Sequence, residues 1–412
     1  MPWPQPPLAP PAVLMRKPLM RIPYTDILAP PTIVPASAST FQGALAALVS
    51  FFQAPPRPGL PDSTVLLTGA GLSVASGLAD YRGVKGTYRV NKTYRPIYHY
   101  EFVSSHEARK RYWARSFLGW STLHKATPNA GHYAIRDLGG LGLIRSVITQ
   151  NVDSFHPNAH PQTPSIELHG YLRSTVCTSC MTEFSRDEFQ RQLARLNPRW
   201  AALLREAMAS GALDTESTEE RRFKGLKTNP DGDVDLPEAP YTTFRYPPCP
   251  KCLADPPDDA SGHKHVVQVD SDGAWAAPST AGILKPAVVM FGESIASRVK
   301  VASEDAIDGA GRLLVLGTSL ATYSAWRLAK RAKDRGMPIA IVNMGGVRGE
   351  DHFFADLDPR QEGEEGVRVE LSTDQLLPGL VSRLRQTGVA ACRRPSAAVS
   401  LENSTVFKDM LS

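Results

Sequence analysis

The chain has 412 residues, of which 42% are hydrophobic and 21% are charged, and its formal net charge is +5. This length allows two or three domains, or one large α/β domain with an insertion. No apolar stretch approaches the roughly twenty residues that a membrane span needs, and the positive charges are scattered along the chain. We therefore predict neither membrane insertion nor direct nucleic-acid binding.

Residues 1–39 are rich in proline and lack helical or strand periodicity, which predicts a disordered or extended arm. Before Asp26 the only charged residues are Arg16, Lys17 and Arg21. A basic start without acidic residues is compatible with an organelle transit peptide, although the prolines weaken the amphipathic helix that such peptides need. The arm therefore suggests a mitochondrial location, with a cytoplasmic or nuclear location as the alternative.

The apolar spacing from Thr40 to Gln53 predicts a helix, and Val65–Leu67 predicts a buried strand that runs into Thr68–Ser73. The small residues of this turn let backbone N–H groups approach a phosphate, and the N-terminus of a following helix would add about half a positive charge. A dehydrogenase fingerprint needs a third glycine and, about twenty positions on, an acidic residue, but Val74 and Asn91 stand there. The turn therefore indicates nucleotide binding without hydride transfer.

Aromatic and basic residues at helical spacing predict a helix within residues 100–125. Further apolar runs predict strands at Ile144–Ile148, Ala287–Phe291, Leu313–Leu316 and Ile339–Val342. Each of these strands ends at a polar or glycine-bearing loop. Because ligands of open α/β sheets bind outside the carboxyl ends of the strands, we expect these loops to share one site.

The strand-and-loop alternation is interrupted between residues 171 and 284, a segment with many prolines and most of the cysteines. We predict an α/β fold in which residues 40–170 and 285–390 form a Rossmann-like parallel sheet domain. Residues 171–284 would form an inserted small domain with a structural zinc, and residues 391–412 a polar tail.

The zinc prediction rests on two C-x-x-C pairs, Cys177 with Cys180 and Cys249 with Cys252. Four thiolates are a ligand set for tetrahedral structural zinc, and they leave no open coordination position for catalysis. About seventy residues separate the pairs, more than in a compact zinc ribbon, so a larger segment must be looped out. Redox-active thiols and unrelated cysteines are the alternatives, and Cys392 in the tail receives no role.

His169 lies in Ile166–Gly170, at the predicted border of the two domains, where a cleft is expected. An imidazole with a pKa near neutrality suits a general base. His156 is a competing candidate for this role, and we expect most of the ten histidines to be structural.

Taken together, these segments resemble the sirtuins, the NAD-dependent protein-lysine deacylases, over about residues 40–385. The matching motifs, in the order of the family, are Gly69-Ala70-Gly71-Leu72-Ser73, Ser76-Gly77-Leu78-Ala79-Asp80-Tyr81-Arg82, Thr149-Gln150-Asn151-Val152-Asp153, His169-Gly170, the two cysteine pairs, Lys285-Pro286, Phe291-Gly292-Glu293, Gly317-Thr318-Ser319-Leu320 and Val342-Asn343-Met344-Gly345. Arg111–Trp120, Leu196–Trp200 and Pro230–Val234 are similar to class II, the sirtuin-4-like branch.

The resemblance implies that NAD binds along the strand ends and that acylated lysine side chains of proteins are the partners. Implied NAD contacts are Gly69, Ala70, Gly71, Leu78, Asp80, Tyr81, Arg82, Gln150, Asn151, Asp153, Gly317, Thr318, Ser319, Asn343, Met344, Gly345 and Thr373. The implied catalytic residues are His169, as general base on a ribose hydroxyl, and Asn151, which would hold the reacting ribose and a water. The products would be nicotinamide, free lysine and 2'-O-acyl-ADP-ribose.

The chain departs from the family at several positions. Ala79 stands where proline is usual, which should loosen the cofactor loop, and Tyr81 stands where phenylalanine is usual. Pro157–Pro161 replaces the usual Ala-Gly, so we expect that loop to differ in shape. We find no plain tyrosine–arginine pair placed to hold an acidic acyl group.

The resemblance leaves two other functions open. A protein mono-ADP-ribosyltransferase on the same fold would share every motif named above. A non-catalytic NAD-binding scaffold is the other alternative, but the retention of Asn151, Asp153 and His169 argues against it.

Overall fold

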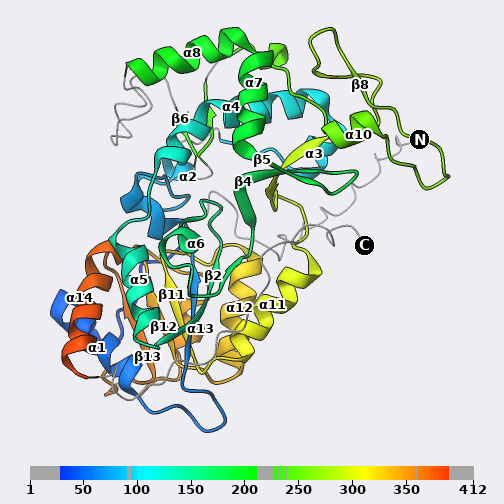
Figure 1. The fold of residues 1–412 in the computed structure, drawn as a ribbon. Coiled ribbons are helices and arrows are strands. Elements are labelled where there is room, and N and C mark those ends of the chain that lie inside the picture. Colours follow the sequence, from blue (N-terminus) through cyan, green and yellow to red (C-terminus); the bar gives the residue numbers. More distant parts are fainter. Residues whose placement is uncertain are drawn as a thin grey trace, which may run out of the picture.

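The computed structural model describes residues 28–90, 94–210, 227–229, 232–236, 239–358 and 360–388. The start of the predicted arm, the predicted tail and Asp231 lie outside these residues. The chain forms a larger and a smaller lobe, with the larger lobe at the bottom of Figure 1. Within the described part of the chain, no helix has the length and apolar character needed to cross a membrane.

The larger lobe is built on a six-stranded parallel sheet with the order β13-β12-β11-β1-β2-β3. Its strands are β1 (Thr64–Thr68), β2 (Ile144–Thr149), β3 (Ser165–Glu167), β11 (Arg312–Leu316), β12 (Ile339–Val342) and β13 (Gly366–Val369). The strands predicted at the positions of β1, β2, β11 and β12 are confirmed. The two edge strands, β3 and β13, are short and were not predicted.

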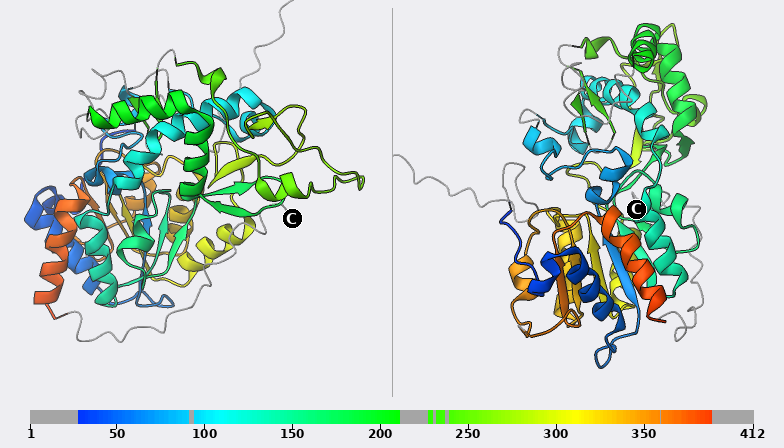
Figure 2. Two further views of the ribbon diagram at one scale, coloured as in Figure 1. Left: turned by 45° about the horizontal axis from the view of Figure 1, so that its top comes forward. Right: turned by 90° about the vertical axis from the view of Figure 1, so that its left-hand side faces the viewer.

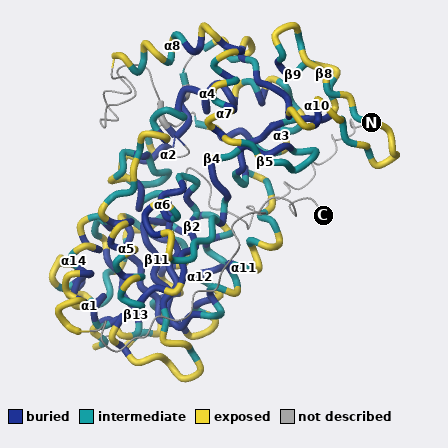
Figure 3. Tube along the Cα trace, viewed as in Figure 1, coloured by how far each residue is buried: buried dark blue, intermediate teal, exposed yellow. Residues whose placement is uncertain are grey.

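Helices cover both faces of this sheet, which explains why its central strands are almost continuously apolar. One face packs on α1 (Phe41–Gln53), α5 (Ala130–Gly140) and α14 (Thr373–Gln386), and the other on α11 (Ser297–Asp308), α12 (Tyr323–Asp334) and α13 (Glu350–Phe354). Alternate residues of a strand point to opposite faces of the sheet. Leu66 therefore packs in the core with α1, α5 and α14, whereas Val65 and Leu67 pack in the core with α11, α12 and α13. Figure 3 shows the buried strands between the more exposed helices.

The predicted helix after Thr40 is confirmed as α1, whose first turn is capped by the Thr40 hydroxyl accepting from the Gly43 amide at 3.1 Å. Residues 28–39 of the predicted disordered or extended arm pack on the larger lobe. The segment η1 (Ala36–Ser39) buries Ala38, and Val34 forms an antiparallel bridge with Arg368. The bridge occurs because β13 is an edge strand with backbone groups that need partners.

The helix predicted after the glycine turn is a short 3₁₀ helix, η2 (Ala70–Ser76). Gly77 ends it in a left-handed conformation, with φ of 82°. The Asn129 side chain then donates hydrogen bonds to the Leu72 carbonyl oxygen and to the Ser76 hydroxyl. These side-chain contacts hold η2 where the sequence pattern predicted a helix.

The smaller lobe contains a three-stranded antiparallel sheet with the order β10-β4-β5, several helices and two short hairpins. Its elements are α3 (His99–Ser104), α4 (His106–Lys125), β4 (Gly170–Cys177), β5 (Glu183–Ser185), α7 (Arg186–Leu196), α8 (Pro198–Ala209), β6 (Lys227–Thr228), β7 (Val234–Asp235), η3 (Tyr241–Thr243), α10 (Pro250–Ala254), β8 (Gln268–Val269), β9 (Trp275–Ala276) and β10 (Leu284–Val288). Figure 2 shows this lobe from two further sides.

The strand predicted at Ala287–Phe291 is misplaced. The observed strand is β10, which pairs with β4 of the smaller lobe and not with the large parallel sheet. The pairing shifts between Pro286 and Val288, where the proline lacks a ladder donor. Residues 289–291 leave the sheet, and the Val289 amide donates to the His169 carbonyl oxygen.

The predicted range 40–170 also includes residues that pack in the smaller lobe. Phe102, Trp113 and Phe117, from α3 and α4, share one core with Cys177 and Cys252. The aromatic residues of α4 are too large to remain exposed, and Phe189 and Phe244 of the cysteine-bearing segment cover them. The smaller lobe is therefore built from two separate stretches of the chain.

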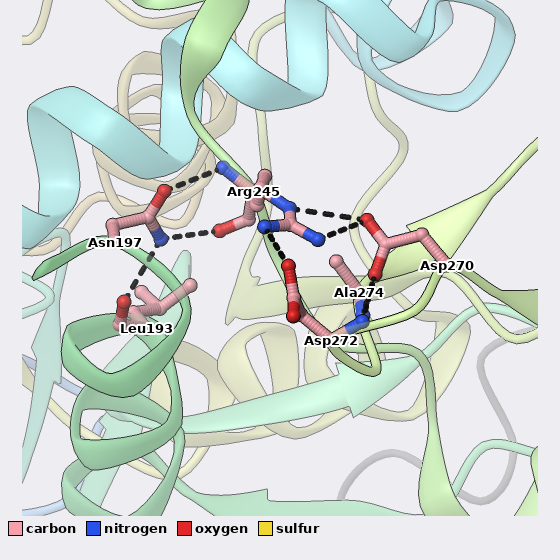
Figure 4. A network of polar contacts seen from close by, with 6 residues as sticks. All are labelled: Leu193, Asn197, Arg245, Asp270, Asp272 and Ala274. Carbon is pink, nitrogen blue, oxygen red and sulfur yellow. Dashed lines mark hydrogen bonds and ion pairs between the residues drawn. The ribbon is translucent and has the colours of Figure 1, made fainter.

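A polar network around Arg245 holds three segments of the smaller lobe together (Figure 4). The Arg245 amide donates to the Asn197 side chain at 2.8 Å, and Asn197 donates back to the Arg245 carbonyl oxygen at 2.7 Å. The guanidinium of Arg245 donates to Asp270 and Asp272. The Asp270 carboxylate in turn accepts from the Ala274 amide. The network therefore connects the end of α7, the segment at Arg245 and the 270–274 loop.

Candidate active site

A cavity of about 1860 Å³ lies between the two lobes, at the carboxyl ends of the parallel strands. This volume exceeds the roughly 300–1,000 Å³ of a typical small-molecule site, so the cleft has room for two ligands. The predicted site residues that line it are Gly69, Ala70, Gly71, Leu78, Asp80, Tyr81, Arg82, Gln150, Asn151, Asp153, His169, Gly317, Thr318, Ser319, Asn343, Met344 and Gly345. Thr373 does not line it, because that side chain is buried at the start of α14.

The floor of the cleft is made by two glycine-bearing loops that pack backbone against backbone. The Gly71 amide donates to the Gly317 carbonyl oxygen at 2.8 Å, and a Cβ at Gly71 would lie 2.9 Å from Gly317 Cα. A Cβ at Gly317, where φ is +58°, would lie 2.3 Å from the Leu72 nitrogen. Side chains are therefore excluded here, and a phosphate could approach the backbone itself.

Three polar residues after β1 and β2 form one hydrogen-bonded unit. The Asn151 side chain donates to the Gly69 carbonyl oxygen at 3.2 Å and to the Ser73 hydroxyl at 3.0 Å. The Ser73 hydroxyl donates to Asp153 at 2.7 Å, and the Phe155 amide donates to the other Asp153 oxygen. Burial raises the pKa of the Asp153 carboxyl, while these two hydrogen bonds lower it. The carboxyl group is thus held in one orientation at the cleft wall.

His169 follows the edge strand β3 and faces the cleft. Its Nδ1 lies 3.2 Å from the Gln150 carbonyl oxygen, which accepts the Nδ1 proton, and its Nε2 lies 2.8 Å from the Ser324 hydroxyl. Burial lowers the pKa of His169 to about 4, although the Gln150 carbonyl partly opposes this shift. The ring is therefore neutral near pH 7, and its Nε2 lone pair can accept a proton.

The side chain of Gln150 links the loop after β2 to the loop after β11. Its Nε2 donates to the Thr318 hydroxyl at 2.9 Å, and its Oε1 accepts from the Thr322 hydroxyl at 3.1 Å. Thr322 precedes α12, and Ser324 lies in its first turn. Residues 322–324 thus connect Gln150 and His169, and they lie just after the sequence motif that ends at Leu320.

The competing candidate His156 does not line the cleft. It is buried in α6 (Phe155–Ala159), where Nε2 contacts the Thr68 hydroxyl at 2.8 Å and Nδ1 contacts His160 Nε2 at 2.8 Å. Burial lowers the pKa of His156 well below its usual range. His156 is therefore a structural residue of the larger lobe.

The segment after η2 forms an aromatic wall. The rings of Tyr81 and Tyr88 lie 5.3 Å apart and those of Tyr88 and Tyr94 lie 5.8 Å apart. The guanidinium of Arg82 lies 5.0 Å from the Tyr88 ring, and the Gly83 amide donates to Asp80. This wall brings a cation and several ring faces to the cleft.

A second arm of the cleft reaches into the smaller lobe, and most of its lining was missed in the sequence. Tyr112, Arg115, Leu123, Asp233 and Val288 line it, and Arg115 pairs with Asp233 at 2.8 Å. Helix α4 brings Tyr112 and Arg115 to the cleft, a tyrosine and an arginine that were not singled out from the sequence. The sequence signal that could have identified these lining residues is the pair of class II segments, Arg111–Trp120 and Pro230–Val234, which contain Arg115 and Asp233.

The hairpin that carries Asp233 packs closely on α4. A Cβ at Gly119 would lie 1.7 Å from the Gly232 carbonyl oxygen, so only glycine allows this contact. The Asn229 side chain also donates to Asp233 at 2.5 Å. Asp233 therefore opposes the charge of Arg115 from a fixed position.

The four cysteines converge as predicted. Their sulfur atoms all lie within 4.8 Å of one another, with 3.6 Å between Cys177 and Cys252 and between Cys180 and Cys249. A zinc tetrahedron with bonds of about 2.3 Å has edges of about 3.8 Å, whereas a disulfide needs about 2.05 Å. The amides of Ser179 and Cys252 donate to the first sulfur of each pair. The set fits a closed structural zinc site.

The fold and the site define a class of α/β proteins with three features. These are a cleft large enough for a dinucleotide, a buried neutral histidine and a module with four cysteine thiols. The Sir2 family model matches residues 69–324, and the chain belongs to this family. The predicted resemblance and fold class are confirmed. A solved structure described as "Structural Basis for the Mechanism and Regulation of Sir2 Enzymes" has a TM-score of 0.50 at 24% identity and covers 83% of this chain and 98% of its own.

The relatives agree with this assignment. NAD-dependent protein deacylase SIR4 of Batrachochytrium dendrobatidis is 39% identical over 327 residues, which are 78% of this chain and 90% of the relative. NAD-dependent protein deacylase SRT2 of Arabidopsis thaliana is 36% identical over 69% of this chain and 67% of the relative. NAD-dependent protein lipoamidase sirtuin-4, mitochondrial, of Bos taurus is 33% identical over 72% of this chain and 78% of the relative. The predicted similarity to the sirtuin-4-like branch is therefore confirmed.

Proposed function

We propose that this protein is an NAD-dependent protein-lysine deacylase that releases nicotinamide, free lysine and 2'-O-acyl-ADP-ribose. The observation that carries the proposal is that His169, Asn151 and Asp153 line one cleft with a second arm in the smaller lobe. The first part of the cleft suits a dinucleotide and the second part a modified side chain, so the two substrates would meet beside His169. The names of the relatives as NAD-dependent protein deacylases support this function.

Bound NAD would supply an electrophilic anomeric carbon with nicotinamide as the leaving group. The glycine backbone at Gly71 and Gly317, together with Arg82, would hold the pyrophosphate. Asp153 would accept a hydrogen bond from the carboxamide of nicotinamide, and the buried Leu78 would contact its ring. Asn151 would orient the ribose next to these groups.

His169 would act as the general base. Because Nδ1 donates to the Gln150 carbonyl oxygen, Nε2 is the atom that accepts a proton from the ribose hydroxyl. The low pKa keeps this atom unprotonated at neutral pH. The Ser324 hydroxyl, which contacts Nε2, would have to yield that position to the ribose.

The second arm would receive the acyl-lysine. Leu123 and Val288 give it apolar lining, and the charge of Arg115 is compensated by Asp233. We therefore propose an uncharged acyl group as the preferred substrate. An acidic acyl group would compete with Asp233 for the same guanidinium.

The test is incubation with NAD and a panel of acylated peptides, with His169→Ala and a control, His124→Ala, beside the wild-type chain. His124 is an exposed residue of α4 and does not line the cleft. We expect nicotinamide release that requires an acyl-lysine, falls by about a hundred-fold or more in His169→Ala and persists in His124→Ala. Transfer of ADP-ribose to protein without any acyl-lysine would instead establish the transferase alternative.

We also propose that the protein acts in mitochondria. The basic, acid-free start of the chain and the printed name of the Bos taurus relative support this location. Fractionation of cells that express the full chain would test it, and recovery outside mitochondria would contradict it.

A further inference from the structure

The chain segment before α1 lies against the end of the cleft that is farthest from His169. That end is formed by the loops after β12 and β13, whereas His169 follows β3 at the opposite edge of the sheet. Leu28 and Pro30 line the cleft there, next to Asn343, Met344 and Glu370. In the right-hand view of Figure 2 the first described residues, in dark blue, run along the larger lobe from the level where the lobes meet.

The segment is held in place by backbone contacts. The Val34 amide donates to the Arg368 carbonyl oxygen at 3.2 Å, and the Arg368 amide donates to the Val34 carbonyl oxygen at 2.6 Å. The buried guanidinium of Arg368 donates to the carbonyl oxygens of Asn343 and Gly345, at 3.0 and 2.6 Å. The residue that anchors the segment therefore also fixes the loop at this end of the cleft.

A second close contact lies nearer to the cleft. A Cβ at Gly346 would lie 2.0 Å from the Ala29 carbonyl oxygen and 2.9 Å from Leu28 Cβ. Farther along, Ile33 packs against the core of the larger lobe. The segment thus meets the loop after β12 without intervening side chains.

We propose that residues 28–34 form the outer wall of the adenine end of the NAD site. This inference rests on the proposed function, which places nicotinamide beside His169 and therefore adenosine at the other end. Residues 28–40 carry no charged side chain, and Leu28 and Pro30 offer apolar surface. Such surface suits the flat, uncharged adenine ring better than it suits a phosphate.

The inference is tested on the full chain by the binding of two probes, ADP-ribose and nicotinamide mononucleotide. ADP-ribose contains the adenosine half of NAD, and nicotinamide mononucleotide lacks it. Leu28→Asp introduces a carboxylate into the wall, and Gly346→Ala pushes the segment away. The matched controls are Leu203→Asp, a partly exposed leucine of α8, and Gly140→Ala, where a Cβ would meet no atom within 4 Å.

We expect both wall variants to weaken ADP-ribose binding by about ten-fold, with unchanged affinity for nicotinamide mononucleotide and unchanged binding in the controls. Hydrogen exchange of the wild-type chain provides a measurement that does not depend on a variant. ADP-ribose should increase the protection of residues 28–34, and nicotinamide mononucleotide should not.

The outcomes separate this inference from the proposed function. If the wild-type chain binds neither NAD nor ADP-ribose, the proposed function fails. If it binds both, but the wall variants bind ADP-ribose normally and the exchange of residues 28–34 is unchanged, only the inference is overturned. An equal loss for both probes in the wall variants would also overturn it, since that result indicates a general structural defect.

Discussion

At the scale of single residues, the contact between Ser324 and His169 bears most directly on the chemistry. The Ser324 hydroxyl donates to Nε2, the atom that takes the proton in the proposed reaction. A hydrogen bond to this lone pair stabilises the neutral imidazole, so it lowers the pKa of His169. Ser324 is therefore a positioning residue whose influence can be measured through pH.

We expect Ser324→Ala to raise the pKa of His169 by about half to one unit, because a net hydrogen bond is worth about 1 kcal/mol. Since His169 acts in its neutral form, the acid limb of kcat/KM for an acylated peptide should move to higher pH. Ser324→Thr keeps the hydroxyl and should retain the wild-type profile. Identical acid limbs in all three proteins would show that the contact does not influence the base.

The ion pair between Arg115 and Asp233 makes a second prediction at this scale. Asp233→Asn removes the charge that compensates Arg115 and leaves the guanidinium facing the second arm. We expect the preference for succinyl-lysine over acetyl-lysine, measured as the ratio of kcat/KM values, to rise by about ten-fold. Asp334→Asn, at an exposed acidic residue of α12, is the control, and an equal ratio in both variants would refute the assignment.

At the scale of elements, three buried histidines connect α5 and α6. The rings of His132 and His156 lie 5.2 Å apart, and His156 contacts His160. Burial lowers the pKa of all three, to about 3 for His132. The three rings therefore form one buried cluster between α5 and α6.

The cluster predicts a loss of stability in acid. The folded-state pKa values lie below the unfolded value of about 6.5, so the unfolded chain binds more protons as the pH falls. The neutral histidines therefore contribute their full stability above a pH of about 6.5. Below that pH the free energy of unfolding falls, by up to about 1.4 kcal/mol per pH unit for each histidine, until the pH reaches the folded-state pKa. Denaturant melts at pH 7 and pH 5 should show a smaller loss for His160→Gln than for the wild-type chain. The exposed control His263→Gln should lose as much stability as the wild-type chain. An equally large loss in His160→Gln would contradict the prediction.

The cysteine module predicts the effect of metal removal. Structural zinc can contribute on the order of 10 kcal/mol to the folding of its module. We expect one zinc per chain by elemental analysis, and unfolding of the smaller lobe before the larger lobe on chelation. Trp113, Trp200 and Trp275 lie in the core of the smaller lobe, so tryptophan fluorescence should report this step. Unfolding of both lobes in one transition, or protein without zinc, would contradict the prediction.

At the scale of the whole molecule, the central sheet and the cleft could be predicted largely from sequence. Buried parallel strands are continuous apolar runs, and polar loops follow them at the carboxyl end of the sheet. This pattern predicted that Gly71, Asn151 and Gly317 share one site, and all three line the cleft. The short edge strands β3 and β13 lack such a signal. Ile166 and Val367 belong to runs too brief to distinguish from loops.

The remaining differences arise where the partner of a segment decides its structure. The aromatic residues of α4 indicate burial but do not say which lobe buries them. Val34 pairs with Arg368 through backbone groups, which every residue has. The proline-rich sequence around Val34 therefore gave no signal that predicts this β-bridge. The resemblance placed Thr373 at the site, yet Thr373 is the buried first residue of α14. Leu28 and Pro30 line the end of the cleft next to the loop after β12.

The most direct test of the whole account is the stoichiometry of a single turnover with NAD and an acylated peptide. The joint cleft predicts that nicotinamide, deacylated peptide and acyl-ADP-ribose form in equal amounts, and that none forms when either substrate is omitted. Removal of the acyl group without consumption of NAD, or nicotinamide release at the same rate without the peptide, would contradict it.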